Sequence, residues 1–180
     1  MTDKLSAIKK GQAKSVALIG LLIGISFAGS HIKLFGTIAF DSLPAFLAAL
    51  MLGPAAGAAV GFLGHIFTAL LSGFPLSVYI HIVVALSMSA TMAVFGAVHR
   101  VLEGKIPLKL TDAVSALAGV IFNGPVSLAL SMGAMAALFG REAAVGLIAL
   151  LPILILASAV NIFLALAVFR AVGKARENRT

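Results

Sequence analysis

The sequence predicts an all-α integral membrane protein, a compact bundle of six transmembrane helices that forms one membrane domain over residues 1–180. Composition is the first reason, because 61% of the residues are hydrophobic and 11% are charged, whereas soluble domains average ~45–50% apolar and ~25% charged residues. The second reason is that apolar segments recur along the whole chain. The third is the placement of the basic residues. The chain has no Cys, which excludes disulfides and thiolate metal sites.

The basic residues predict the topology. Eleven of the 13 fall before the first apolar segment, in one mid-chain loop or at the C-terminus: Lys4, Lys9, Lys10, Lys14, Arg100, Lys105, Lys109, Arg170, Lys174, Arg176 and Arg179. Only Lys33 and Arg141 lie elsewhere. Six crossings put the eleven on one side and these two on the other, as the positive-inside rule requires when both termini are cytoplasmic. The net charge of +7 therefore reflects membrane topology and does not indicate a nucleic-acid partner.

Hydropathy, Gly and Pro predict helices over about 13–28, 42–52, 54–71, 76–102, 111–138 and 144–172. The first follows a basic start and resembles a signal peptide, but apolar segments continue after it, so we expect a retained helix. Small residues recur along one face of this helix at spacings of three or four: Ala13, Ala17, Gly20, Gly24 and Ala28. Such a stripe lets helices approach closely in lipid. It fits packing inside the bundle and docking to a partner subunit equally well.

The second helix is too short for the ~20 residues of a perpendicular span, and Gly53-Pro54 ends it. The alternative is that 42–71 is one broken, re-entrant element. Asp41-Ser42, followed by Pro44, is typical of a helix start. Asp41 is therefore either a helix cap or a substrate contact.

Asn123-Gly124-Pro125 interrupts the fifth helix, where Pro125 removes a backbone donor and should kink the helix. At ~1.5 Å per residue Asn123 lies roughly 18 Å from the helix start, just outward of the midplane. It either contacts a ligand or satisfies the freed backbone. On neighbouring helices, we expect Asn161 to make an interhelical hydrogen bond and His99 to lie at the cytoplasmic interface without a site role.

Polar side chains within the apolar run from His31 to His81 predict a binding site, because such groups are costly in lipid unless they face a partner or a wet cavity. With Phe side chains from the adjoining loops, they favour a neutral or weakly charged heteroaromatic ligand. The candidates for substrate binding, converging on the outer side of the bundle, are Asp41, His65, Thr68, Tyr79, His81 and Asn123.

The sequence lacks the motifs that several kinds of enzyme and nucleotide-binding protein require. The chain has no Gly-x-Ser-x-Gly nucleophile motif, no P-loop and no Gly-x-Gly-x-x-Gly, so we expect no enzyme activity and no cofactor in this chain. Any ATP would be used by partner subunits. The histidines are 16 or more residues apart, which is unlike a helical zinc site. A metal permease built on His65 and His81 nevertheless stays open as an alternative, because both lie near the outer side.

A Cys-free bundle of this length with Ala13-Lys-Ser-Val-Ala17 in the inner part of its first helix resembles the substrate-binding S components of energy-coupling-factor (ECF) vitamin transporters. The run GTIAFDSLPAFLAALMLGP, then GFLGHIFTALLSGFPL and then His81, is similar to members that serve vitamin and cobalamin-precursor uptake. The resemblance covers nearly the whole chain.

The resemblance implies a multi-pass protein of the bacterial cytoplasmic membrane that captures a vitamin or vitamin precursor from outside. It implies a membrane T subunit, which Ala13 and Ala17 would contact, and two ATPase subunits that drive release by toppling the S component. The loop over 31–41 would gate the pocket, with Lys33, Phe35 and Phe40 as gating residues. The ligand we expect is alpha-ribazole or another cobalamin-related compound, with pantothenate and a thiamine precursor as alternatives. A secondary carrier or channel that needs no ATPase is the competing function.

Overall fold

The computed structural model describes the backbone of residues 2–31, 33–34, 38–39 and 41–178. Its helices are α1 (Thr2–Gly29), α2 (Leu43–Met51), α3 (Pro54–Leu71), α4 (Val78–Leu102), α5 (Leu108–Ile121), α6 (Ser127–Phe139), α7 (Arg141–Val145) and α8 (Leu151–Glu177). A π-helical turn (Phe122–Val126) joins α5 to α6, and a 3₁₀ turn (Gly146–Leu150) joins α7 to α8. Strands β1 (Lys33–Leu34) and β2 (Ile38–Ala39) form a short antiparallel hairpin before α2.

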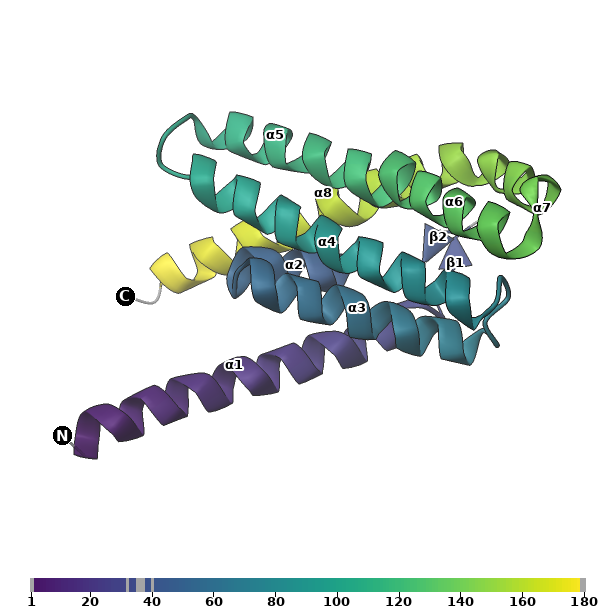
Figure 1. The fold of residues 1–180 in the computed structure, drawn as a ribbon. Coiled ribbons are helices and arrows are strands. Elements are labelled where there is room, and N and C mark those ends of the chain that lie inside the picture. Colours follow the sequence, from purple (N-terminus) through teal and green to yellow (C-terminus); the bar gives the residue numbers. More distant parts are fainter. Residues whose placement is uncertain (1, 32, 35–37, 40, 179–180) are drawn as a thin grey trace.

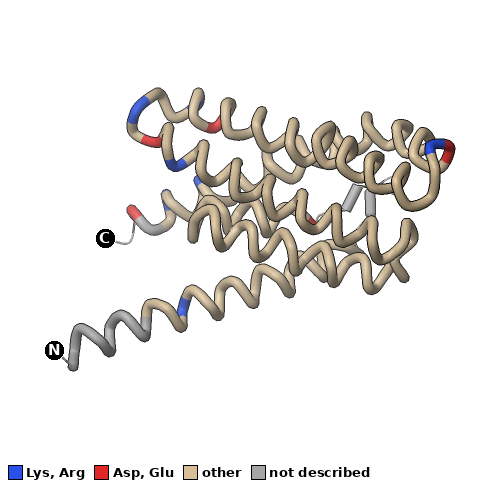
Figure 2. Tube along the Cα trace, viewed as in Figure 1, with Lys and Arg blue, Asp and Glu red and all other residues tan. Residues whose placement is uncertain are grey.

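The predicted all-α membrane bundle is confirmed. With α5–α6 and α7–α8 each counted as one interrupted helix, the described chain forms six helical segments, and five of them are long and apolar enough to cross a membrane. The exception is α2, which has nine residues. Both termini and the loop between α4 and α5 lie at one end of the bundle (Figure 1). Most of the Lys and Arg residues that Figure 2 colours lie at that end. Helix α7, which begins with Arg141 and Glu142, lies at the other end (Figure 1). By the positive-inside rule the end with the termini is cytoplasmic.

The short helix α2 lies at the centre of the bundle. Residues 44–49 are buried, and α2 contacts α1, α3, α4 and α8. A helix that is apolar on all sides belongs in a core, which explains why α2 does not need the length of a membrane span. Its Phe46 packs edge-to-face against Phe95 of α4 at 5.0 Å between ring centroids. Met92, Ile162 and Val60 complete the fully buried core around it.

The sharp turn between α2 and α3 depends on small residues. Gly53 has a φ of 106°, a conformation that L side chains rarely adopt, and the guanidinium of Arg100 lies directly over it. One turn further, Gly57 lies against α2, where a Cβ would approach the Ala49 Cα to 2.8 Å. The two helices therefore pack with their backbones in close contact.

Gly57→Ala is expected to lower the free energy of unfolding by about 1–3 kcal/mol, because the added methyl group overpacks the α2–α3 contact. Denaturation in mixed micelles, followed by circular dichroism, measures this change. Gly133→Ala is the matched control, since Gly133 also lies within a helix and has no atom within 4 Å of an added Cβ. Equal stability of the two variants would contradict the close packing of α2 on α3.

The small-residue stripe of α1 faces away from the bundle. Leu22 and Ser26 are buried against the neighbouring helices, whereas the five stripe residues, Ala13, Ala17, Gly20, Gly24 and Ala28, are all exposed. At 100° per residue the stripe lies opposite the buried face. Helix α1 runs beside α3 at its C-terminal end and diverges from the bundle towards its N-terminus (Figure 1). Within the described residues the stripe is therefore not buried against another helix of this chain.

The cytoplasmic end holds a polar cluster that the sequence does not predict. His99 lies at this end as expected, but its ring is buried, with 3% of the residue exposed, rather than placed in the interface. Its Nε2 lies 3.2 Å from Asp112 Oδ1, and Arg170 donates to both Asp112 oxygens. The fifth helix begins at Leu108 after Pro107, three residues before the predicted start at 111. Asp112 therefore lies inside this helix, where it pairs with Arg170.

Candidate functional site

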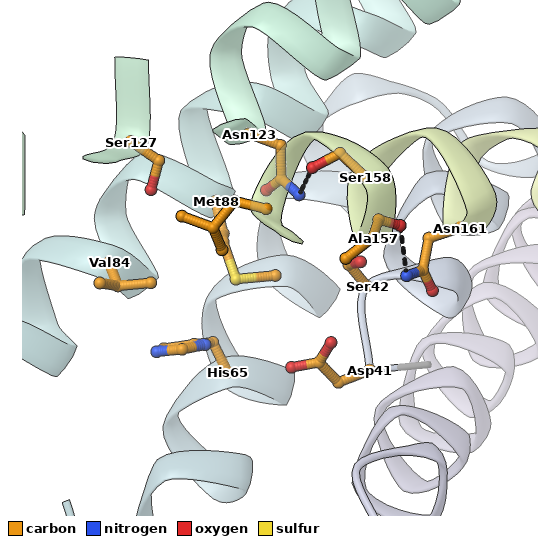
Figure 3. Close-up of a pocket in the computed structure, with 11 residues that line it drawn as sticks. Asp41, Ser42, His65, Val84, Met88, Asn123, Ser127, Ala157, Ser158 and Asn161 are labelled. Carbon is orange, nitrogen blue, oxygen red and sulfur yellow. Dashed lines mark hydrogen bonds between the residues drawn. The ribbon is translucent and has the colours of Figure 1, made fainter. Parts of the chain in front are cut away.

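The outer half of the bundle encloses a cavity of about 170 Å³, which we call the polar chamber. The start of α2, the helices α3, α4, α6 and α8, and the π-helical turn all contribute to its wall (Figure 3). Its lining contains one carboxylate, two amides, three hydroxyls and one imidazole. The lining residues are Asp41, Ser42, His65, Val84, Met88, Asn123, Ser127, Leu154, Ala157, Ser158 and Asn161.

A second cavity of about 180 Å³, the apolar chamber, adjoins the first and is lined mainly by leucines. Six residues line the apolar chamber and not the polar one: Leu76, His81, Leu128, Ser131, Leu147 and Leu150. Four residues line both chambers: His65, Val84, Ser127 and Leu154. Neither volume alone reaches the ~300 Å³ at the lower end of small-molecule pockets, whereas the two together do. The chambers therefore suit one ligand with a polar and an apolar part.

Asp41 enters the polar chamber from the segment before α2. In Figure 3 its carboxylate points across the chamber towards the ring of His65. The backbone carbonyl of Asp41 accepts a hydrogen bond from Ser26 of α1, which anchors this segment to the first helix. The N-cap of α2 is Ser42, without a side-chain capping bond. Instead, the Leu43 N–H donates to Asn161 Oδ1 of α8 at 3.0 Å. This bond confirms the interhelical hydrogen bond predicted for Asn161.

The break predicted at Asn123-Gly124-Pro125 is confirmed as the π-helical turn. Pro125 lacks the N–H that an α-helix requires, so the turn widens there. The turn presents Asn123 to the polar chamber, where its Nδ2 donates to Ser158 Oγ at 2.8 Å (Figure 3). The Asn123 amide is thus bonded to a side chain of α8, and the residue lines the cavity.

His65 of α3 and His81 of α4 form a pair at the boundary of the chambers. His65 Nε2 and His81 Nδ1 are 3.2 Å apart, and the rings stack with centroids 5.4 Å apart. In such a pair one nitrogen donates its proton and the other accepts it. The two remaining ring nitrogens, His65 Nδ1 and His81 Nε2, are buried and have no partner within the described residues. A buried polar atom without a partner is costly, so a ligand or water that reaches the pair would be stabilised there.

Thr68 and Tyr79, which the sequence also predicts for the site, line neither chamber. The buried hydroxyl of Thr68 also lacks a partner within the described chain. Tyr79 is 67% exposed on the outer surface of α4 and is not brought to the pocket. Phe35 and Phe40 lie outside the described residues, and so does the side chain of Lys33, whose backbone belongs to β1.

Sequence reasoning missed the serines of the site. Ser127 lines both chambers, its Oγ lies 2.6 Å from Ser87 Oγ, and Ser131 donates to its carbonyl. Ser158 accepts the hydrogen bond that Asn123 donates. The available signal was the helical spacing of Ser127 and Ser131 directly after Pro125, in an otherwise apolar segment. Met88 and the leucines of the apolar chamber carry no such signal, because their type is common throughout the chain.

The charges of the site restrict its ligand. Asp41 supplies the sole carboxylate among the residues that line the two chambers, and no Lys or Arg lines either. An anionic ligand would bring a second negative charge into a partly desolvated space in which the described lining residues offer no cation to pair it. The polar chamber instead suits a neutral or cationic ligand with hydrogen-bond donors, while the leucines suit a flat apolar group.

The described residues contain no group of three His, Asp or Glu side chains close enough to hold a metal ion. His65 and His81, on which a metal permease would depend, are hydrogen bonded to one another.

A protein-family model described as "ECF transporter, substrate-specific component" matches residues 14–173, which is most of the chain. No curated protein and no solved structure matches the chain significantly. The matched region begins within α1 and includes every residue that lines the two chambers.

Proposed function

Because the chain belongs to the substrate-specific components of ECF transporters, we propose that its two chambers together capture a vitamin or vitamin precursor, with alpha-ribazole or a related cobalamin precursor as the ligand. A substrate-specific component is a multi-pass subunit of the cell membrane that binds its substrate and is not an enzyme. Such components work with a T subunit and ATPase subunits. Any ATP is then used by the partners, and this chain needs no cofactor of its own.

The observation that carries the ligand proposal is the two-part pocket with a single carboxylate. Alpha-ribazole combines a flat, methylated heteroaromatic ring with a hydroxyl-rich ribose and has no negative charge. Its ring matches the leucine-lined apolar chamber, and its hydroxyls match the acceptors of the polar chamber, Asp41 and Asn123 among them. Pantothenate carries a carboxylate that would lie near Asp41, where the described lining residues include no cation. Thiamine and its precursors each carry a single hydroxyl, so they match fewer of these acceptors than the ribose does.

Equilibrium binding to the isolated protein in nanodiscs tests this proposal, with alpha-ribazole, pantothenate and thiamine as probes. We expect alpha-ribazole to bind at least about tenfold more tightly than pantothenate, a factor that corresponds to 1.4 kcal/mol. Tighter binding of pantothenate would contradict the assignment of the polar chamber. Failure of all three probes would exclude this ligand class.

A further inference from the structure

A groove between α5 and α8 lies on the surface of the bundle that would face lipid, away from the two chambers. Its apolar section is a hollow of about 470 Å³, floored by the small residues Ala113, Ala116 and Ala159. Phe163 and Leu117, which are 71% and 61% exposed, stand at its sides. A second hollow of about 320 Å³ continues it and is lined by Lys109 and Arg170. Asp112, Phe163 and Leu166 line both hollows, so the two form one groove.

The length of the groove along the two helices is about the thickness of one leaflet of a bilayer. On α5 it extends from Lys109 to Val120, and on the antiparallel α8 from Arg170 to Ala159. Eleven residues at 1.5 Å each give about 16 Å on either helix. This length is about half of the ~30 Å hydrocarbon core. Since Lys109 and Arg170 lie at the cytoplasmic end, the apolar section spans the inner leaflet.

The mouth of the groove is cationic. Arg170 binds Asp112 through Nε and Nη2, and its Nη2 lies 3.3 Å from His99 Nε2. These contacts leave Nη1 for a further acceptor, and the side chain is 29% exposed. Lys109 approaches from the first turn of α5. Lys174, one helical turn beyond Arg170, is also exposed. Positive charge at a groove mouth on the cytoplasmic side attracts anionic headgroups.

From this arrangement we propose that the α5–α8 groove binds one anionic phospholipid of the inner leaflet. Its phosphate lies between Lys109 and Arg170, and one acyl chain lies along Ala113, Ala116 and Ala159. The charge at the mouth favours an anionic lipid over a zwitterionic one, and the small floor residues give the chain a recess that a flat helix surface lacks. The pair Asp112–His99 acts as a positioning group that holds the Arg170 guanidinium at the mouth.

Native mass spectrometry tests this site, with protein released from nanodiscs that contain equal amounts of phosphatidylglycerol and phosphatidylcholine with identical acyl chains. We expect one phosphatidylglycerol to be retained preferentially. Lys109→Gln should lower its retention about fivefold, the factor that corresponds to one surface cation. Lys105→Gln is the matched control, because it removes the same charge four residues earlier, in the loop before α5, and lies outside the groove. It should change retention less than about twofold.

A second variant tests the recess. Ala113→Phe fills the apolar section at an exposed position and should lower retention of both lipids. Equal effects of Lys109→Gln and Lys105→Gln, or no preference for phosphatidylglycerol in the wild type, would overturn the site. So would weaker assembly with the T subunit in Lys109→Gln at unchanged lipid retention, which would make the groove a protein contact. Binding of alpha-ribazole should be unchanged in all variants, so the outcome is independent of the proposed transport function.

Discussion

The double variant Ala13→Trp and Ala17→Trp is expected to abolish uptake while the isolated protein binds its ligand as before. Both alanines lie on the exposed face of α1, opposite the buried Leu22 and Ser26. Two indole rings would keep a partner helix from approaching this face. A docking loss of about 3 kcal/mol corresponds to roughly a hundredfold drop in assembled transporter. The measurement is uptake of labelled alpha-ribazole by cells that also produce the T and ATPase subunits.

Leu86→Trp is the control, because Leu86 of α4 is also an exposed apolar residue, at 56%. Uptake by this variant should match the wild type, and binding of alpha-ribazole in nanodiscs should change less than about twofold in either protein. If the double variant kept its uptake, the docking role of Ala13 and Ala17 would be wrong. If it lost ligand binding as well, the variant would have damaged the fold and not the docking surface.

Asp41→Asn is expected to weaken alpha-ribazole binding by about 10- to 100-fold, because a hydrogen bond to a charged group contributes about 1.5–3 kcal/mol. The Asp41 carboxylate points into the polar chamber, whose described lining has no second carboxylate to accept the same hydrogen bond from the ligand. Asparagine keeps the size of the side chain, so the segment before α2 should remain in place. Isothermal titration of the protein in nanodiscs measures the change.

Glu142→Gln removes one carboxylate at the same end of the bundle and serves as the control, since Glu142 is exposed in α7 and lines neither chamber. Its affinity for alpha-ribazole should remain within about twofold of the wild type. Equal losses in the two variants would point to a general electrostatic effect. No loss in Asp41→Asn would remove Asp41 from the ligand contacts.

The features that were predictable from the sequence depend on local chemistry and on membrane topology. The distribution of Lys and Arg placed both termini at one end, because charge bias determines orientation. Pro125 broke its helix because a missing N–H acts wherever it lies. Gly53-Pro54 ended α2 for a similar reason, since Gly53 adopts a positive φ. His65, His81 and Asn123 reached one region because the topology brings the outer ends of their helices together.

The features that could not be predicted depend on which face of a helix turns inward. Tyr79 and His81 are two residues apart on α4, yet Tyr79 is exposed and His81 is buried. Apolar residues surround both positions in the sequence, so hydropathy cannot distinguish the faces of such a helix. Asn161 lies 118 residues from Leu43 in the sequence, yet its side chain accepts a hydrogen bond from the Leu43 N–H. The cluster of His99, Asp112 and Arg170 likewise joins three helices, and no local pattern reports such contacts.

Mass spectrometry of the small molecule that co-purifies with the solubilised protein identifies what the two chambers hold. We expect one vitamin-like ligand with a flat apolar part and a donor-rich, uncharged or cationic part. We predict a single co-purifying compound of this kind, displaced by alpha-ribazole and lost from Asp41→Asn protein. A co-purifying carboxylate or phosphate that Asp41→Asn protein retains would contradict the account.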